Sequence, residues 1–388
     1  MGLDNIILEL AVIFAGAAIL GTLFLYLRQP IILAYIALGA LIGPLGFNVL
    51  GSAEHIEHLS HVGIVLLLFL LGLNLHPSKL LQLFRKTSIV TLGTSLAFML
   101  LGFGVCLGLG LSMKEGLVAG AALMFSSTIV SLKLTPTTTL HQKHTGEMMI
   151  SVLLFQDILA ILLILFLSGG GDGNGLWGSV MIVLKLAGLG LFSLAAVKFV
   201  IIPLFRRFDV IKEYFFLASL GWCLIMAEAA YILGLSYEMG AFLAGVAMAA
   251  FPIALVIAEN LKPLREFFLI LFFFSIGARF DLFVTANLLL PGILLTAVLM
   301  LAKPFLFRTA FKVIGEEPRI ARELGVRLGQ ASEFSLLVAY SAEKSGQIAV
   351  NVSYLIQTVV ILTFIASTYW VVSKYPTPIS SKSELRAD

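Results

Sequence analysis

The chain has 388 residues, of which 60% are hydrophobic and only 12% are charged, and its mean hydropathy is +1.05. Soluble domains carry roughly 25% charged residues, so this composition excludes an ordinary soluble protein. The apolar runs are long and continuous, as a spanning helix of about 20 residues requires, whereas the strands of an outer-membrane barrel would be short and alternating. We therefore expect an all-α polytopic membrane protein. The net charge of +3 indicates no particular partner.

Thirteen apolar segments follow one another along the chain, and each predicts a spanning helix. The predicted helices cover residues 5–27, 31–48, 60–75, 87–111, 116–133, 147–168, 176–205, 213–233, 237–258, 265–279, 284–313, 323–342 and 351–373. An odd number of spans places the two termini on opposite sides of the membrane.

The basic residues of the connections alternate between two sets of loops. One set holds 18 Lys and Arg residues, and the other holds only Lys114, Arg279 and Lys344. Because cytoplasmic loops carry an excess of Lys and Arg, we expect the N-terminus outside and the C-terminus in the cytoplasm. The protein is thus expected to be multi-pass in the cytoplasmic (inner) membrane of the cell.

A glycine-rich stretch, SGGGDGNG at residues 168–175, follows the sixth span and is typical of a flexible outer loop. One long span and then six more follow it. Six spans, a linker helix and six spans are the arrangement of an inverted repeat. We predict a first repeat over 1–175, a linker helix over 176–212, a second repeat over 213–374 and a cytoplasmic tail over 375–388.

Polar side chains interrupt several of these apolar spans. Asp157 is the only charge in VLLFQDILAILLILFL, and an ionised carboxylate inside a bilayer costs several kcal/mol unless it is paired or hydrated. Spans five and twelve, each the fifth of a six-span half, carry polar clusters, and span eleven carries a lysine. Clusters at matched positions indicate discontinuous helices that cross at a midplane site. The residues are Ser126, Ser127 and Thr128 in span five, Gln330, Ser332 and Glu333 in span twelve, and Lys303.

A carboxylate at such a site holds a proton or a cation, but usually not both. Burial and a neighbouring ammonium act in opposite directions on its protonation, and this competition is the physical core of a cation/proton antiporter. One carboxylate that exchanges one proton for one monovalent ion would be electroneutral.

Structural roles remain as alternatives at each position. Asp157 could bond to nearby hydroxyls, Lys303 could neutralise a carboxylate, Glu333 could stabilise its own span, and Ser126 and Ser127 could be ordinary interhelical hydrogen bonders. No nucleophile–base pair, metal motif or phosphate loop appears in the sequence, so we expect no enzyme, no metal site and no cofactor. The basic residues are spread over the inner loops, so nucleic acid is not an expected partner.

Five sequence segments together resemble the monovalent cation:proton antiporter-2 family, most closely its Kef-type potassium/proton branch. They are VLLFQDI, SSTIV, MGAFLAGV, GQASEFSLLV and LFFFSIGARFDL, and they occur across nearly the whole chain. The Gln156–Asp157 pair matches the Gln-Asp pair of Kef-type members, where related Na⁺/H⁺ exchangers carry Asn-Asp or Asp-Asp.

The resemblance implies an NhaA-like antiporter fold with inverted six-helix repeats, two crossed discontinuous helices and an elevator-like movement of a core against a dimerisation domain. Asp157 would bind the ion and the proton, and Gln156 would supply an amide oxygen that shapes selectivity. Lys303 would pair with Asp157 or with the polar groups of span five when no ion is bound. Ser126, Ser127 and Thr128 would line the site, with Gln330, Ser332 and the GEF-like Glu333 in support.

By the same resemblance, the substrates are H⁺ and K⁺ or Na⁺, with K⁺ favoured, and the partners are the lipid bilayer, a second copy in a homodimer and, where present, a separate regulatory subunit. The alternatives are a Na⁺/H⁺ antiporter, a ligand-gated K⁺ efflux system that works like a channel, and a membrane sensor. Kef-type proteins usually continue into a nucleotide-binding domain, but here a short polar tail follows the last span. The loop AENLKPLREFF keeps Glu259 without the family's dense acidic run, so we do not extend glutathione gating to this chain.

Overall fold

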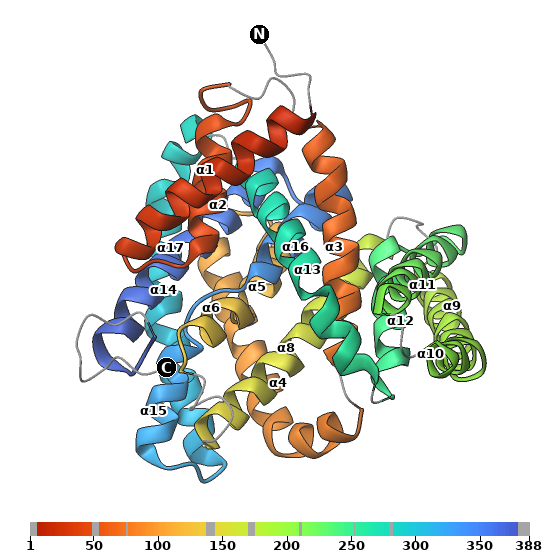
Figure 1. Cartoon of the computed structure of the whole chain (residues 1–388). Helices are drawn as coiled ribbons and strands as arrows, with labels where there is room; N and C mark the ends of the chain where they lie inside the picture. Colours follow the sequence, from red (N-terminus) through yellow and green to blue (C-terminus); the bar gives the residue numbers. More distant parts are fainter. Residues whose placement is uncertain are drawn as a thin grey trace. The chain divides into compact units, whose positions relative to one another are not determined.

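The computed structural model describes residues 6–48, 54–74, 77–136, 144–169, 175–208, 212–251, 253–278 and 282–378. Within these residues the regular structure is helical throughout, and the helices form two compact units (Figure 1). Eight helices of the described part are long and apolar enough to cross a membrane. The predicted tail and glycine-rich loop lie mostly outside the described residues.

The described part of unit 1 contains ten helices, some of which continue beyond the unit, and they come from three separate stretches of the chain. They are α1 (Ile6–Tyr26), α2 (Ile31–Ile42), α4 (Pro77–Gly108), α5 (Met113–Leu123), α6 (Thr128–Lys133), α8 (His144–Gly169), α14 (Leu282–Val313), α15 (Pro318–Arg327), α16 (Glu333–Lys344) and α17 (Val350–Lys374). Its core joins apolar side chains of α4, α8, α14 and α15, with Phe98 and Phe307 in edge-to-face contact at 5.0 Å between ring centroids.

Two of the predicted spans are interrupted in unit 1. Span five is divided into α5 and α6 by residues 124–127, and span twelve is divided into α15 and α16 by residues 328–332. Ser127 caps α6 through the N–H of Val130, and Ser332 caps α16 in a capping box with Ser335. A short hydroxyl side chain that binds the backbone in this way starts a new helix.

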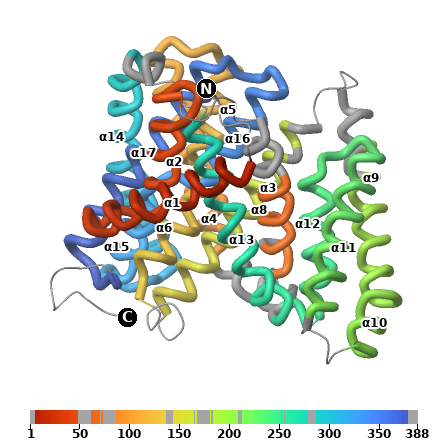
Figure 2. The backbone as a smooth tube through the Cα atoms, turned by 45° about the horizontal axis from the view of Figure 1, so that its top comes forward, coloured from red at the N-terminus to blue at the C-terminus, as the bar shows by residue number. Residues whose placement is uncertain are grey.

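Unit 2 contains α3 (Glu54–Asn74), α9 (Gly175–Ala196), a π-helical turn η1 (Val197–Ile201), α10 (Ile202–Arg207), α11 (Lys212–Ile232), α12 (Tyr237–Ala249) and most of α13 (Ile253–Ala278). Helix α12 packs against α3, α11 and α9 (Figure 2). Glycine permits this contact: a Cβ on Gly245 would lie 2.1 Å from the carbonyl oxygen of Phe69 on α3. Small residues let membrane helices approach to backbone contact.

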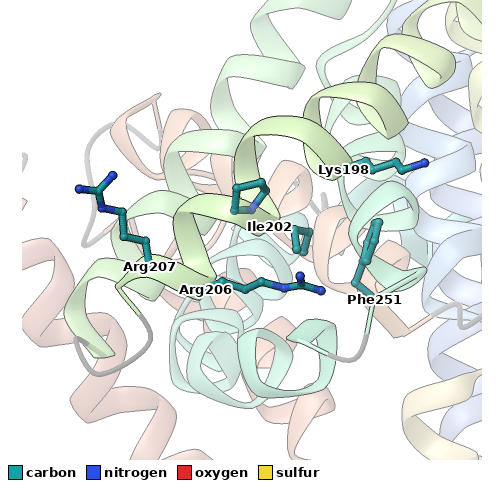
Figure 3. Close-up of a pocket in the computed structure, with 6 residues that line it drawn as sticks. Lys198, Ile202, Arg206, Arg207 and Phe251 are labelled. Carbon is teal, nitrogen blue, oxygen red and sulfur yellow. The ribbon is translucent and has the colours of Figure 1, made fainter.

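The predicted linker helix changes its winding near its end. Pro203 has no N–H to donate and crowds the preceding turn, and the π-helical residues 197–201 directly precede α10. An open groove of about 610 Å³ lies at this point (Figure 3). Its lining includes the exposed cations Lys198, Arg206 and Arg207, and the two arginines belong to the connection that the charge pattern places in the cytoplasm.

The predicted boundary between spans nine and ten is wrong. The polarity of residues 259–264 predicts a connection there, but α12 ends at Ala249 and α13 already begins at Ile253. The break lies between these two residues, and the sequence there contains a proline, which disfavours the helical conformation of the residue before it. Glu259 and Lys262 are therefore helical residues of α13 rather than loop residues.

The compact units and the predicted inverted repeats are different divisions of the chain. Each unit draws helices from the segments 1–175 and 213–374. Repeat symmetry describes how the two halves are related, whereas the units describe which helices pack together, so the repeats remain a prediction.

Candidate ion-binding site

The two interruptions of unit 1 meet each other directly. The hydroxyl of Ser126 donates to the carbonyl of Leu328 at 2.8 Å, and the hydroxyl of Ser335 donates to the carbonyl of Ala122 at 2.6 Å. Helix ends leave backbone groups without intrahelical partners, and a bilayer offers no water to satisfy them. The two interruptions and the helix ends beside them therefore satisfy backbone carbonyls of one another.

Asp157, on α8, points at the start of α6. Both of its carboxylate oxygens lie 3.0 Å from the hydroxyl of Thr128, and the residue is only 2% exposed. Within the described residues, no Lys, Arg or His side chain forms an ion pair with it. A buried carboxylate without a cationic partner is costly, which marks this position as one that needs a proton or a cation.

Glu333 brings a second carboxylate to the same end of α6. Its Oε1 accepts a hydrogen bond from the N–H of Ile129 at 3.2 Å, and its Oε2 is buried with no hydrogen-bond partner among the described residues. Thr128 and Ile129 are consecutive, so two carboxylates from two different helices bind adjacent residues. This arrangement was not part of the sequence prediction, which gave Glu333 a supporting role.

Gln156 precedes Asp157, but its amide is turned to the protein. Its oxygen accepts from the N–H of Ser126 at 3.0 Å, and its nitrogen donates to the hydroxyl of Ser95 on α4 at 3.3 Å. Both ends of the amide thus bind protein groups. The predicted role of this oxygen in ion selectivity stays a prediction, and in this conformation the amide holds the interruption in place.

Lys303, on α14, is fully buried and binds backbone carbonyls. Its ammonium donates to Phe125 at 2.6 Å and to Gln330 at 3.1 Å, and it lies 5.2 Å from the ring centroid of Phe98. These carbonyls belong to the interruptions that follow α5 and α15, where the helix dipoles are negative. The ammonium therefore contacts the backbone of spans five and twelve, and the described residues show no ion pair between it and Asp157. The two predicted pairings, with Asp157 or with the polar groups of span five, stay predictions.

Gln330 and Ser332 organise the interruption of span twelve. The amide nitrogen of Gln330 donates to Ser131 on α6 at 2.7 Å, and its oxygen accepts from Ser367 on α17 at 3.0 Å. The N–H of Ala331 donates to Thr363, also on α17, at 3.1 Å. Helix α17 thus supports the site.

The predicted site residues come together from α8, α14 and the two interruptions, but they divide by what they touch. Asp157, Thr128 and Glu333 form a carboxylate cluster, whereas the other predicted residues bind backbone or supporting side chains. The sequence prediction missed four polar supports: Ser95, Ser131, Thr363 and Ser367. Their signal was a hydroxyl within an apolar run, which is common wherever membrane helices pack and so does not single out a site.

Comparisons with known proteins agree with this architecture. Residues 11–374 match the family described as "Sodium/hydrogen exchanger, transmembrane". The chain is 33% identical to "K(+) efflux antiporter 5" of Arabidopsis thaliana over 86% of its own length, and 32% identical to "Glutathione-regulated potassium-efflux system protein KefC" of Enterobacter sp. (strain 638) over 88%. It spans 60% and 56% of those two proteins.

Two further similarities extend over more of the other protein. An "Iron transporter MagA" of Paramagnetospirillum magneticum is 29% identical, with 93% of this chain and 83% of that protein covered. The solved structure of the sodium proton antiporter MjNhaP1 from Methanocaldococcus jannaschii superposes with a TM-score of 0.68 at 16% identity, covering 94% of this chain and 96% of the other. At that identity the likeness establishes the fold.

Proposed function

The chain belongs to the transmembrane sodium/hydrogen exchanger family, and on that premise we propose that it exchanges a monovalent cation for H⁺ across a membrane, with Asp157 as the group for which the two ions compete. The predicted resemblance to Kef-type antiporters is confirmed by the K⁺ efflux relatives. The names of those relatives are names of transport proteins, which supports a transporter rather than an enzyme.

The observation that carries the proposal is the pair of buried carboxylates at the start of α6. Asp157 and Glu333 bind Thr128 and Ile129, and within the described residues neither forms an ion pair with a cationic side chain. Two ionised carboxylates close together in a low-dielectric site repel each other. A bound cation or a bound proton relieves this repulsion, and binding of one reduces the need for the other.

We favour K⁺ as the cation. The names of the Arabidopsis and Enterobacter relatives refer to K⁺ efflux, and Gln156 matches the glutamine of the Kef-type pair. The amide of Gln156 acts in this proposal by fixing the interruption at Ser126, which sets the distance between the start of α6 and Asp157. Gln156 would then shape selectivity through this distance, while direct coordination of the ion by its amide oxygen stays a prediction.

An elevator-like cycle agrees with the grouping of the site residues. Every predicted site residue belongs to unit 1, so the site can move as one body without breaking its own hydrogen bonds. The hydrogen bonds between the interruptions keep the carboxylate cluster intact during such a movement. Unit 2 would then hold the homodimer together, as the resemblance predicts.

Proton flux in proteoliposomes tests the exchange. The purified protein is reconstituted with a pH-sensitive dye, and K⁺, Na⁺, Li⁺ and choline are added in turn. We expect K⁺-dependent proton movement in the wild type and its loss in Asp157→Asn, because the amide can neither release a proton nor bind a cation by charge. Glu147→Gln, which changes an exposed carboxylate on the same helix, should keep wild-type flux.

The same assay separates the alternatives. A response to Na⁺ rather than K⁺ would make the chain a Na⁺/H⁺ antiporter and leave the role of Asp157 intact. Cation leak without a proton signal would overturn exchange and favour the channel-like system. Wild-type exchange in Asp157→Asn would show that the carboxylate is structural.

A further inference from the structure

Arg327 is the last residue of α15 and stands immediately before the interruption that carries Gln330. It is only 2% exposed and is among the largest fully buried side chains of the described residues. A buried guanidinium must have its donors satisfied. The acceptors of its hydrogen bonds therefore show which segments this residue connects.

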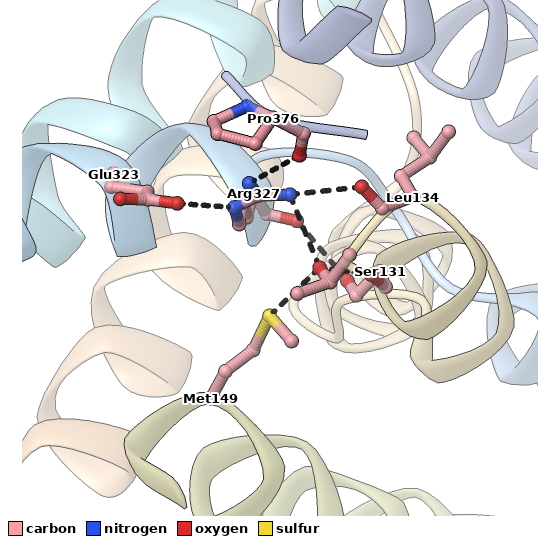
Figure 4. Close-up of polar contacts among 7 residues, drawn as sticks. Ser131, Leu134, Met149, Glu323, Arg327 and Pro376 are labelled. Carbon is pink, nitrogen blue, oxygen red and sulfur yellow. Dashed lines mark hydrogen bonds and ion pairs between the residues drawn. The ribbon is translucent and has the colours of Figure 1, made fainter. Parts of the chain in front are cut away.

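The guanidinium binds three segments at once (Figure 4). Its Nε donates to Glu323 at 2.9 Å on its own helix, and its Nη1 donates to the carbonyl of Leu134 at 3.0 Å and to the hydroxyl of Thr135 at 3.1 Å, just beyond α6. Its Nη2 donates to the carbonyl of Pro376 at 2.9 Å, just beyond α17. Only a planar fork with several donors can serve such divergent acceptors.

The contact with Leu134 caps the C-terminal end of α6. Leu134 is the C-cap of this helix, and a basic side chain there satisfies carbonyls that lack intrahelical partners. The backbone of Arg327 forms a further contact with α6, because its carbonyl accepts a hydrogen bond from the hydroxyl of Ser131, in the middle of the helix, at 3.1 Å. One residue thus fixes α6 at its centre and at its end.

The other end of α6 holds the carboxylates. The helix has six residues and is roughly 9 Å long at 1.5 Å per residue, so its orientation depends on the contacts at its two ends rather than on its own few hydrogen bonds. A small tilt at Leu134 displaces Thr128 and Ile129, and with them the donors to Asp157 and Glu333.

We propose that Arg327 is a positioning residue of the ion site, which holds α6 in the orientation that binds Asp157 and Glu333 and ties that orientation to the backbone at Pro376. The inference rests on the proposed exchange function. It gives the segment that leaves α17 a direct mechanical connection to the site. The ring of Tyr375, whose centroid lies 5.6 Å from the guanidinium carbon, belongs to the same segment. Burial raises the pKa of the Tyr375 phenol, so this ring is neutral near neutral pH.

Arg327→Lys tests the proposal, because it keeps the charge and removes the fork. We expect the cation concentration at half-maximal flux to rise roughly tenfold or more, the effect of losing about one charge-assisted hydrogen bond, with the maximal rate nearly unchanged. Backbone amides of residues 129–134 should exchange hydrogen faster. Thr135→Val removes one acceptor and should shift half-saturation in the same direction by less. Arg319→Lys, which changes an exposed arginine on the same helix, should change neither quantity.

The proposal is overturned if Arg327→Lys folds, shows wild-type half-saturation for the cation and has wild-type rates of amide hydrogen exchange in α6. A reduced maximal rate at unchanged half-saturation also overturns it, because that pattern indicates a merely structural arginine. If Arg327→Lys does not fold, Thr135→Val decides: a shift supports the proposal and wild-type behaviour overturns it. Absence of flux in the wild type is failure of the proposed function, and hydrogen exchange of α6 in detergent then still tests the connection.

Discussion

The polar side chains of the site fall into two groups. Those of Gln156, Ser126 and Lys303 form hydrogen bonds with the two interruptions of unit 1. The carboxylate oxygens of Asp157 and Glu333 can still bind a cation or a proton. The distinction follows from which atoms are satisfied: the Gln156 amide has a partner at both ends, and Oε2 of Glu333 has none among the described residues. Residues of similar polarity at the same depth therefore have different roles. We expect substitutions of the two groups to differ in what they change.

Thr128→Val should weaken cation binding without unfolding the protein. Valine has nearly the shape of threonine but lacks the hydroxyl that lies 3.0 Å from both oxygens of Asp157. Loss of a hydrogen bond to a charged group costs about 1.5–3 kcal/mol, so half-saturation should rise roughly tenfold or more. Proteoliposome flux at graded cation concentrations measures it, and Thr22→Val, at an exposed threonine on α1, is the control. Unchanged half-saturation in Thr128→Val would contradict a direct role for the hydroxyl.

Lys303→Met should lower stability rather than selectivity. The substitution leaves the carbonyls of Phe125 and Gln330 without the ammonium that now binds both, and each buried unsatisfied group costs about 1–3 kcal/mol. Thermal unfolding in detergent should therefore shift to clearly lower temperature. Lys312→Met, at an exposed lysine near the end of the same helix, should unfold like the wild type. Equal midpoints for both variants would show that the carbonyls do not depend on Lys303.

At the scale of helices, the sequence located the interruptions but not the directions of their side chains. The polar clusters at residues 126–128 and 330–333 overlap the interruptions that the structure has at 124–127 and 328–332, because such residues compete for backbone hydrogen bonds. The amide of Gln156 could face an ion or a backbone N–H, and residue type alone does not decide between them. The break between Ala249 and Ile253 was missed because the prediction gave more weight to the polar residues 259–264 than to the proline in the sequence. The contacts of Arg327 were equally out of reach, because its partners Leu134 and Pro376 lie 193 and 49 positions away along the chain.

The glycine contact between α3 and α12 gives a prediction at this scale. Gly245→Ala would place a Cβ 2.1 Å from the carbonyl oxygen of Phe69, and overpacking typically costs about 1–3 kcal/mol. Gly221→Ala on α11 is the matched control, because a Cβ at that position would have nothing within 4 Å and alanine favours a helix by about 0.5–1 kcal/mol. The two midpoints of thermal unfolding should move in opposite directions. A stabilised Gly245→Ala would show that α3 and α12 separate easily.

For the whole molecule, the separation of site and scaffold follows the packing units rather than the order of the chain. Unit 1 combines helices from residues 1–51, 82–167 and 276–388 and contains every predicted site residue, while the long linker and its basic groove belong to unit 2. Composition and loop charges predicted the membrane class and an orientation. They could not predict which helices would pack together, because the apolar faces of membrane helices look alike in sequence.

The orientation of the molecule is open to a direct test. Lys114 belongs to the sparse set of basic residues and Arg319 to the dense set, and both side chains are exposed. Because Lys and Arg concentrate on the cytoplasmic side, a membrane-impermeant maleimide should label Lys114→Cys in intact cells and Arg319→Cys only in inside-out vesicles. Cys106 and Cys223 are buried and are replaced by alanine in both variants and in the unlabelled control. Seven predicted spans separate the two positions, so an odd number of crossings requires opposite sides. The reverse pattern of labelling would show that the protein has the opposite orientation in the membrane. Labelling of both cysteines from the same side would show that a predicted span between them does not cross.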